Sequence, residues 1–362
     1  KPSHKWHTHG WVCIAGCYIL MMYYTSVSGW MLDYFVKFAF GSFDGISTEA
    51  VGDVYSSMLA NPWEMLAFTA ITIIAAAIIC SFSLQGGLER ISKFMMLGLL
   101  LLIGVLAINS FTLEGAGEGL KFFLLPDWNR AMEAGIFNVI VAAMNQAFFT
   151  LSIGMASMEI FGSYMSKDNT LTTEAVRICS LDTFVAITSG LIIFPACFTY
   201  DLEVGAGPSL LFDTMATVFN NMEGGRLWGT LFFLFMTFAS FSTVIAVFEN
   251  LLASCVDSFG WSRKKAVILN CLFVLIASMP ALLGYNVLSD VRLIRGMNIL
   301  DSEDFIVSIL GTGNPFGVML VTLLGLPMYA DIFGTIPIAE ALLAKGAQLG
   351  VVLSFMMGVT TL

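Results

Sequence analysis

Charged residues are scarce in this 362-residue sequence. Lys, Arg, Asp and Glu together make up 12% of it, whereas soluble domains carry about 25% charged residues. Hydrophobic residues make up 57%, and the mean hydropathy is +0.85. This composition does not suit a soluble globular domain, and it indicates a polytopic membrane protein.

Sequence features of nucleic-acid, metal and hydrolytic sites are also missing. The net charge is −10 and no basic patch is present, so we expect no nucleic-acid partner. The seven Cys residues lack zinc-type spacing and fall mostly within apolar stretches, where free Cys behaves as a small hydrophobe. Neither His-Glu-x-x-His nor Gly-x-Ser-x-Gly occurs. We therefore expect no enzyme and no organic cofactor.

Apolar stretches long enough to cross a bilayer, which takes about 20 residues, recur along the chain. They cover residues 11–41, 64–84, 93–112, 136–163, 176–200, 226–256 and 265–288. A polar spacer, 42–63, follows the first stretch, and we find no soluble domain between them. Lys and Arg collect modestly in the short loops of one side, which favours a cytoplasmic N-terminus in a multi-pass inner-membrane protein.

The stretch 137–163 is unusual for a membrane span. Gln146, Thr150, Ser152 and Gly154 lie at its middle, and a Gly costs roughly 1 kcal/mol relative to Ala inside a helix. A broken helix is tolerated in lipid only where protein or a cavity covers it, and transporters use such breaks to bind ions and substrate. The alternative is an intact helix that packs small residues against its neighbours.

Asp182 is an acidic residue inside the apolar stretch 176–200. Such residues are costly in a membrane and usually face an ion or proton pathway. One alternative is an Asp kept neutral by a neighbouring hydroxyl. Another is a proton-coupled or efflux permease in which Asp182 carries the proton.

A polar stripe runs along the stretch 226–256. Ala239, Ser242, Thr243 and Ala246 are spaced to share one helix face. Hydroxyl and carbonyl oxygens are the ligands that hard cations prefer, so the stripe suits Na⁺. The alternative is that the hydroxyls bond to preceding carbonyl groups on a close-packing face. For Glu249, which follows the stripe, we expect a place in packing or a polar network.

Three segments carry a resemblance to one family. Gln146-Ala-Phe-Phe-Thr-Leu-Ser-Ile-Gly154 closely resembles the unwound sixth helix of the neurotransmitter:sodium symporter family, which has the LeuT fold. Tyr23-Tyr-Thr-Ser-Val-Ser-Gly-Trp30 resembles its third helix, and Asp257-Ser-Phe-Gly-Trp-Ser-Arg-Lys-Lys265 resembles a cytoplasmic loop. The match covers residues 1–308, from the third helix of the family pattern to the start of the tenth.

The resemblance implies an all-α membrane protein with a partial inverted-repeat core and a broken helix near 150–155. It implies that Na⁺ drives uptake of an amino acid or related small amine across the plasma membrane by alternating access. The first sodium site would use Thr150 and Asp182. Because the family often has Asn where Asp182 stands, the fixed charge favours chloride independence. The second sodium site would use Ala239, Ser242 and Thr243.

The same resemblance implies a substrate pocket and two gates. The pocket would be lined by Leu20, Tyr24, Phe149, Thr150, Ser152, Met155, Ser242 and Val247, and the gates would use Phe149, Tyr164, Asp257 and Asp304. The apolar members of the pocket favour an aromatic or large aliphatic substrate, since Met adapts its shape to irregular partners. The expected partners are this substrate and the lipid bilayer, and a homodimer is left open.

Residues 309–362 do not continue the family pattern. They resemble a predicted-permease family that includes organoarsenical efflux permeases, which favours a join of two partial transporters near residue 308 over natural divergence. We also expect the first two helices of the pattern to be missing, and with them ligands of both sodium sites. The chain would then be an incomplete, non-transporting membrane fragment that shows no sodium-coupled substrate binding.

Overall fold

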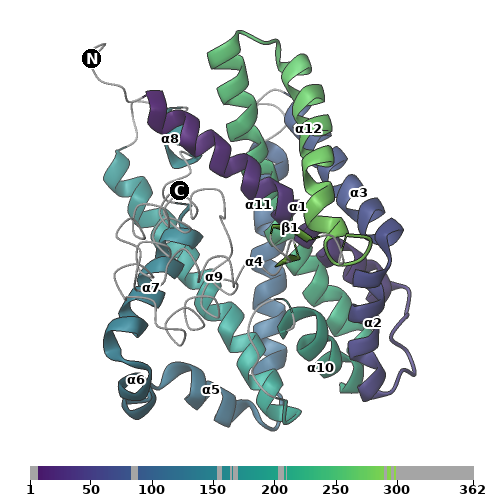
Figure 1. The fold of residues 1–362 in the computed structure, drawn as a ribbon. Coiled ribbons are helices and arrows are strands. Elements are labelled where there is room, and N and C mark those ends of the chain that lie inside the picture. The colour runs from purple at the N-terminus through teal and green to yellow at the C-terminus, as the bar shows by residue number, and fades with distance from the viewer. Residues whose placement is uncertain are drawn as a thin grey trace. The chain divides into compact units, whose positions relative to one another are not determined.

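The computed structural model describes residues 7–82, 89–152, 157–163, 165, 170–202, 208, 210–288, 292–294 and 297–298. This part of the chain is almost entirely helical (Figure 1). The helices are α1 (His7–Ala39), α2 (Thr48–Ala60), α3 (Pro62–Ser81), α4 (Glu89–Phe111), α5 (Ala116–Leu124), α6 (Trp128–Ala134), α7 (Ile136–Thr150), α8 (Ser157–Ser163), α9 (Leu171–Thr199), α10 (Met215–Asn221), α11 (Gly225–Phe259) and α12 (Arg263–Leu283), with a π-helical turn η2 (Leu210–Thr214). One short antiparallel ribbon joins β1 (Arg292–Ile294) to β2 (Met297–Asn298).

Five of the described helical segments are long and apolar enough to cross a membrane. They are Pro62–Ser81, Ser92–Phe111, Leu171–Thr199, Gly225–Phe259 and Arg263–Leu283. Helix α1 has 33 residues, which at 1.5 Å per residue also exceeds the bilayer core. The Tyr, Thr, Ser and Gly residues in its middle lower its hydropathy. The all-α, polytopic membrane class expected from the sequence is confirmed.

The chain divides into two units that are interleaved in sequence. Unit 1 comprises Lys1–Tyr23, Asn129–Glu174 and Ala246–Leu362, and unit 2 comprises Tyr24–Trp128 and Ala175–Ile245. The long helices α1 and α11 are each divided between the two units. Each unit therefore contains segments that are far apart in the sequence.

Close backbone contacts hold the helices of unit 2 together. A Cβ added to Gly29 of α1 would lie 2.9 Å from the backbone nitrogen of Thr69 on α3. A Cβ added to Gly119 of α5 would lie 2.6 Å from the Cα of Pro195 on α9. Small residues that let helix backbones approach are the usual contact between membrane helices. These two glycines thus set how near α1 comes to α3 and α5 to α9.

Aromatic side chains fill the space at one end of unit 2. Phe38 of α1 stacks on Phe43 at a ring-centroid distance of 4.2 Å and on Phe233 of α11 at 5.2 Å. Tyr34 lies 5.0 Å from Phe212 of η2 and 5.1 Å from Phe233. Aromatic pairs contribute about 0.5–1.5 kcal/mol beyond their buried area. This cluster joins α1, η2 and α11.

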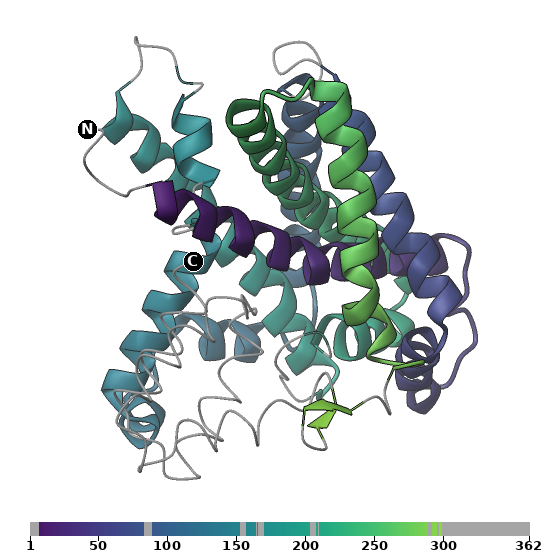
Figure 2. The ribbon, with the colours of Figure 1, turned by 45° about the horizontal axis from the view of Figure 1, so that its top comes forward.

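Polar and charged side chains connect the helices of unit 1. The Asn250 amide of α11 donates to the Cys17 sulfur of α1 at 3.2 Å. Arg263, the first residue of α12, donates to both carboxylate oxygens of Glu249, with distances of 3.0 and 2.6 Å. Figure 2 shows α12 as one continuous helix that a short turn joins to the end of α11. These bonds bring parts of α1, α11 and α12 together.

Some connections are more ordered than the sequence predicts. The spacer 42–63, expected to be a polar linker, contains the 13-residue helix α2. Helices α5, α6 and α10 likewise lie between expected spans. All of them are too short to cross a bilayer, so a search for long apolar stretches does not find them. The expected second family over residues 309–362, and the join near 308, lie outside the described residues.

Candidate functional site

The predicted interruption of 136–163 is present. Helix α7 ends at Thr150 and α8 begins at Ser157. The N–H of Leu151 still donates to the Ala147 carbonyl at 3.2 Å, but Ser152 has φ +53°. This left-handed conformation is uncommon for residues other than Gly, Asn and Asp, and it turns the chain out of the helix. The break expected near 150–155 is confirmed, and residues 153–156 lie outside the described part.

The end of α7 carries the residues that the sequence assigns to sodium and substrate. Thr150 is exposed and Ser152 is half-buried. The carbonyl groups of the last helical turn form the negative end of the helix dipole. A cation placed there would find oxygen atoms of the kind that Na⁺ accepts. The structure does not describe the Phe149 side chain, and Met155, Tyr164 and Asp304 are outside the described residues.

Helices α1 and α11 align two predicted substrate residues within unit 1. The hydrogen bond between Asn250 and Cys17 sets the level at which these helices pass each other. Three residues forward along α1 is Leu20, and three residues back along α11 is Val247. The two helices run antiparallel, and each residue advances by about 1.5 Å along a helix. Leu20 and Val247 therefore lie at the same level. Both are buried, at 5% and 2% exposure.

Unit 2 shows a similar alignment farther along the same helices. The Ser28 and Ser240 hydroxyls lie 3.0 Å apart, in a buried contact between α1 and α11. Four residues back along α1 is Tyr24, and three residues forward along α11 is Thr243. These positions differ in level by about 1.5 Å. The predicted substrate-binding Tyr24 and the predicted sodium ligand Thr243 are therefore at nearly the same depth in unit 2.

The polar stripe of α11 presents two adjacent oxygen atoms. The Ser242 hydroxyl donates to the Ala239 carbonyl at 2.7 Å, and Ala239, Ser242 and Thr243 are all half-buried. This bond is the local contact that a helix-packing Ser makes. It also leaves the Ser242 oxygen as an acceptor beside a carbonyl oxygen, an arrangement that a hard cation can use. The geometry is compatible with both hypotheses for the stripe.

Asp182 lies in the first half of α9, where it is half-buried. The second half of α9 contacts α4, where the Ser110 hydroxyl donates to the Ile192 carbonyl at 3.1 Å. Around Asp182, Leu181 and Phe184 are 55% and 54% exposed. Its place beside Thr150 in one sodium site stays a prediction.

Glu249 has the role in a polar network that its sequence position suggested. Its side chain is 0% exposed, and the two charge-assisted hydrogen bonds from Arg263 occupy both of its oxygens. A planar guanidinium suits such a bidentate contact with a carboxylate. Asp257, predicted as a gate residue, lies two turns farther along α11 and is exposed.

The sequence analysis did not find a second charged cluster, which joins α1 and α3 in unit 2. The Lys37 ammonium lies 2.7 Å from an Asp33 oxygen and 2.7 Å from a Glu64 oxygen. Asp33 and Lys37 are spaced four residues apart on a helix, and Glu64 lies in the first turn of α3. The i, i+4 spacing was a local signal for the first pair, but no local pattern indicates Glu64.

A broken helix and a hydroxyl stripe along another span are typical of membrane transporters. Comparison with known proteins identifies the family. The model of the sodium:neurotransmitter symporter family matches residues 54–291. The chain belongs to this family. The family consists of sodium-coupled transporters and is not an enzyme class.

Two bacterial relatives and one solved structure agree with this assignment. The uncharacterized sodium-dependent transporter YhdH of Bacillus subtilis (strain 168) is 33% identical over 322 residues, which are 89% of this chain and 70% of that protein. An uncharacterized sodium-dependent transporter of Haemophilus influenzae is 30% identical, covering 84% of this chain and 66% of the relative. The crystal structure of MhsT in complex with L-phenylalanine has a TM-score of 0.74 at 31% identity, covering 99% of this chain and 82% of that one. The predicted family and the LeuT-type fold are confirmed.

Proposed function

We propose that the protein takes up an amino acid or related small amine together with Na⁺ across the plasma membrane by alternating access, without a need for chloride. The interruption between α7 and α8 is the observation that carries this proposal. It places the negative end of the α7 dipole, which stabilises a cation, at the break. Similar discontinuous helices hold coupling ions in secondary transporters.

The family resemblance implies two sodium sites. In the first, Thr150 at the end of α7 and Asp182 of α9 bind Na⁺. In the second, the Ala239 carbonyl and the Ser242 and Thr243 hydroxyls of α11 bind it, as supported by the adjacent oxygens of the stripe. A sodium ion beside a substrate carboxylate lowers the cost of burying either charge alone. That mutual stabilisation is the electrostatic origin of the coupling.

The substrate is an aromatic or large aliphatic amino acid. Leu20 and Val247 are buried apolar residues at one level of α1 and α11. A small polar substrate would give such side chains no apolar contact. The complex of the related MhsT with L-phenylalanine also supports this class. We further propose that Asp257 belongs to the cytoplasmic gate, that Asp304 belongs to the extracellular one, and that Phe149 and Tyr164 complete the gates.

Uptake of labelled L-phenylalanine into proteoliposomes tests the proposal, and a complete lack of uptake would instead support the expectation of a non-transporting membrane fragment. An inward Na⁺ gradient should drive accumulation, choline in place of Na⁺ should abolish it, and gluconate in place of chloride should leave it unchanged. Unlabelled leucine and tryptophan should compete better than glycine. Uptake that ignores Na⁺ and follows a pH gradient would instead assign Asp182 as a proton carrier. A polar amino acid that outcompetes leucine would contradict the substrate class.

Substitution of Asp182 tests the first sodium site. Asp182→Ala should abolish Na⁺-dependent uptake because the site loses a charged ligand. Asp182→Asn should keep Na⁺ dependence and acquire sensitivity to chloride, since the fixed negative charge is gone. Glu174→Ala is the matched control, an acidic residue in the first turn of the same helix, and it should transport normally. Normal Na⁺-driven uptake by Asp182→Ala would rule out the assigned role.

A further inference from the structure

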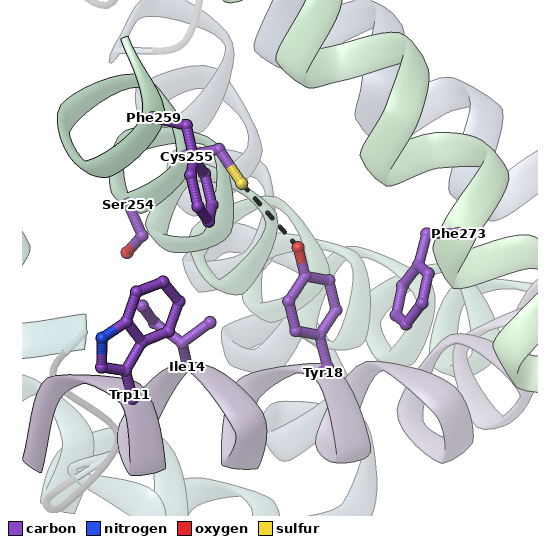
Figure 3. Close-up of a pocket in the computed structure, with 7 residues that line it drawn as sticks. All are labelled: Trp11, Ile14, Tyr18, Ser254, Cys255, Phe259 and Phe273. Atoms are coloured by element: carbon purple, nitrogen blue, oxygen red, sulfur yellow. Dashed lines mark hydrogen bonds between the residues drawn. The ribbon is translucent and has the colours of Figure 1, made fainter. Parts of the chain in front are cut away.

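An apolar groove lies between α1, α11 and α12 in unit 1. Figure 3 shows Trp11, Ile14 and Tyr18 along α1, facing residues of the end of α11, with Phe273 of α12 at one side. The spacing of the three α1 residues places them on a single helix face. The groove encloses about 230 Å³. Pockets for drug-sized ligands measure about 300–1,000 Å³, so a slender occupant is favoured.

The hydroxyl groups that line the groove are already hydrogen-bonded within the protein. The Tyr18 hydroxyl donates to the Asn270 side-chain oxygen, and the Asn270 amide donates to the Ala266 carbonyl at 2.9 Å. The Ser254 hydroxyl donates to the Asn250 carbonyl at 2.9 Å. Because these groups have their partners, the interior offers little to a polar ligand. It suits hydrocarbon.

The groove opens beside a surface that matches the acyl region of a bilayer. Phe273, which lines it, is 53% exposed, and its neighbours Leu272 and Ile276 on α12 are 52% and 68% exposed. Helix α12 is one of the helices apolar enough to cross a membrane. Exposed apolar side chains of that kind contact lipid tails. A lipid chain can therefore reach the groove from the side.

Aromatic and basic residues extend from the groove toward the turn between α11 and α12. Phe259 lines the groove and stacks on Trp261 with centroids 5.1 Å apart, and the Lys265 ammonium lies 4.9 Å from the centre of the Trp261 ring. Trp residues with Lys at the end of a span are typical of the headgroup level. Lys264 is exposed beside Lys265, while Arg263 is paired with the buried Glu249.

We propose that this groove holds an acyl chain of an anionic phospholipid whose phosphate is bound by Lys264 and Lys265. The apolar floor accommodates the hydrocarbon. Among the described residues from the last turn of α11 to the first turn of α12, the two ammonium groups outweigh the exposed acid Asp257. A bound chain would connect α1, α11 and α12, which meet at the groove. The proposal requires only the membrane location, so it is independent of the transported substrate.

Quenching of Trp fluorescence by acyl-brominated lipids in nanodiscs tests this. Brominated phosphatidylglycerol should quench at a lower mole fraction than brominated phosphatidylcholine, and Trp11→Phe should remove part of the quenched signal. A basic residue near an anionic surface contributes a factor of about 5 in affinity. Lys264→Gln combined with Lys265→Gln should therefore reduce the preference for phosphatidylglycerol on the order of 5- to 25-fold. Lys93→Gln, an exposed Lys of α4, should leave it unchanged.

A groove-filling variant tests the contribution of the acyl chain separately from that of the headgroup. Ile14→Phe should weaken quenching by both brominated lipids while the phosphatidylglycerol preference of the remaining signal persists. Quenching that is equal for both lipids in the unmodified protein would overturn the proposal, as would unchanged quenching in Ile14→Phe. A dimer by mass that Trp11→Ala dissociates, without any lipid preference, would assign the groove to a second copy and would also overturn it.

Discussion

The two units of this protein differ in the contacts that stand out between their helices. In unit 2, glycines allow backbones to touch, as at Gly29 against Thr69, and aromatic rings stack around Phe38. In unit 1, side-chain hydrogen bonds connect the helices, above all the two that the half-buried Arg263 donates to the buried Glu249. Membrane helices gain no hydrophobic energy over lipid, so they associate through close packing or through polar bonds. Unit 2 combines close packing with polar contacts, such as the ion pair of Lys37 and Glu64, whereas in unit 1 the bond between Glu249 and Arg263 stands out.

The difference predicts different responses to substitution. Close packing fails when volume is added, and the cost depends on how far the neighbouring backbone can move. A buried ion pair fails when one partner is removed, because the other charge stays in an apolar setting. The polar stripe of α11 belongs to neither mode, since its Ser242 contact is local to the helix.

The largest loss of stability should follow Arg263→Ala. It leaves Glu249, which is 0% exposed, without its charged partner, and such a change costs about 3–5 kcal/mol. Thermal unfolding in detergent should show a large decrease in midpoint. Lys264→Ala, one residue away and exposed, should have almost no effect. If both variants unfold alike, the ion pair does not stabilise unit 1.

The double substitution Glu249→Met with Arg263→Met sharpens this test. Replacing both partners of a buried pair by apolar residues is often neutral. The double variant should therefore recover most of the stability lost in Arg263→Ala. A double variant as unstable as the single one would show that the loss comes from packing around the Arg263 side chain.

A smaller loss should follow Gly29→Ala in unit 2. The new Cβ would lie 2.9 Å from the Thr69 nitrogen and 3.0 Å from the Phe68 carbonyl carbon, so backbone has to shift. Overpacking of this kind costs about 1–3 kcal/mol. Gly98→Ala is the control, because its Cβ would meet only the Phe238 ring at 3.5 Å. Equal unfolding midpoints for the two variants would argue against close backbone packing as the main contact between α1 and α3.

The smallest change in stability, with a change in ion binding, should follow Thr243→Ala. Loss of a hydroxyl ligand to a buried cation should cost about 1–3 kcal/mol, a 5- to 150-fold rise in the Na⁺ concentration for half-maximal uptake. Ser240→Ala on the same helix should lower the stability without changing the Na⁺ requirement. It loses the buried contact with Ser28, about 0.5–1.5 kcal/mol of stability, and keeps its Na⁺ dependence. An unchanged Na⁺ requirement in Thr243→Ala would mean that the stripe only packs helices.

The spans and the helix break could be predicted because their signals are local. A run of about 20 apolar residues is visible in any window of that length, and the polar and Gly residues near Ser152 interrupt one such run. Helix α2 was not predicted because its 13 residues are polar enough to read as a linker. The sodium ligands were assigned by resemblance, and their assignment to the two sodium sites stays a prediction.

The sequence by itself determined the membrane class, the family and the position of the break, because hydropathy and motif are properties of neighbouring residues. Only the tertiary structure decided which distant residues meet. Tyr18 and Asn270 are 252 residues apart in sequence, and Cys17 and Asn250 are 233 apart, yet each pair shares a hydrogen bond. Such partners are selected by the level and rotation at which two helices pack, and these depend on every contact along the interface.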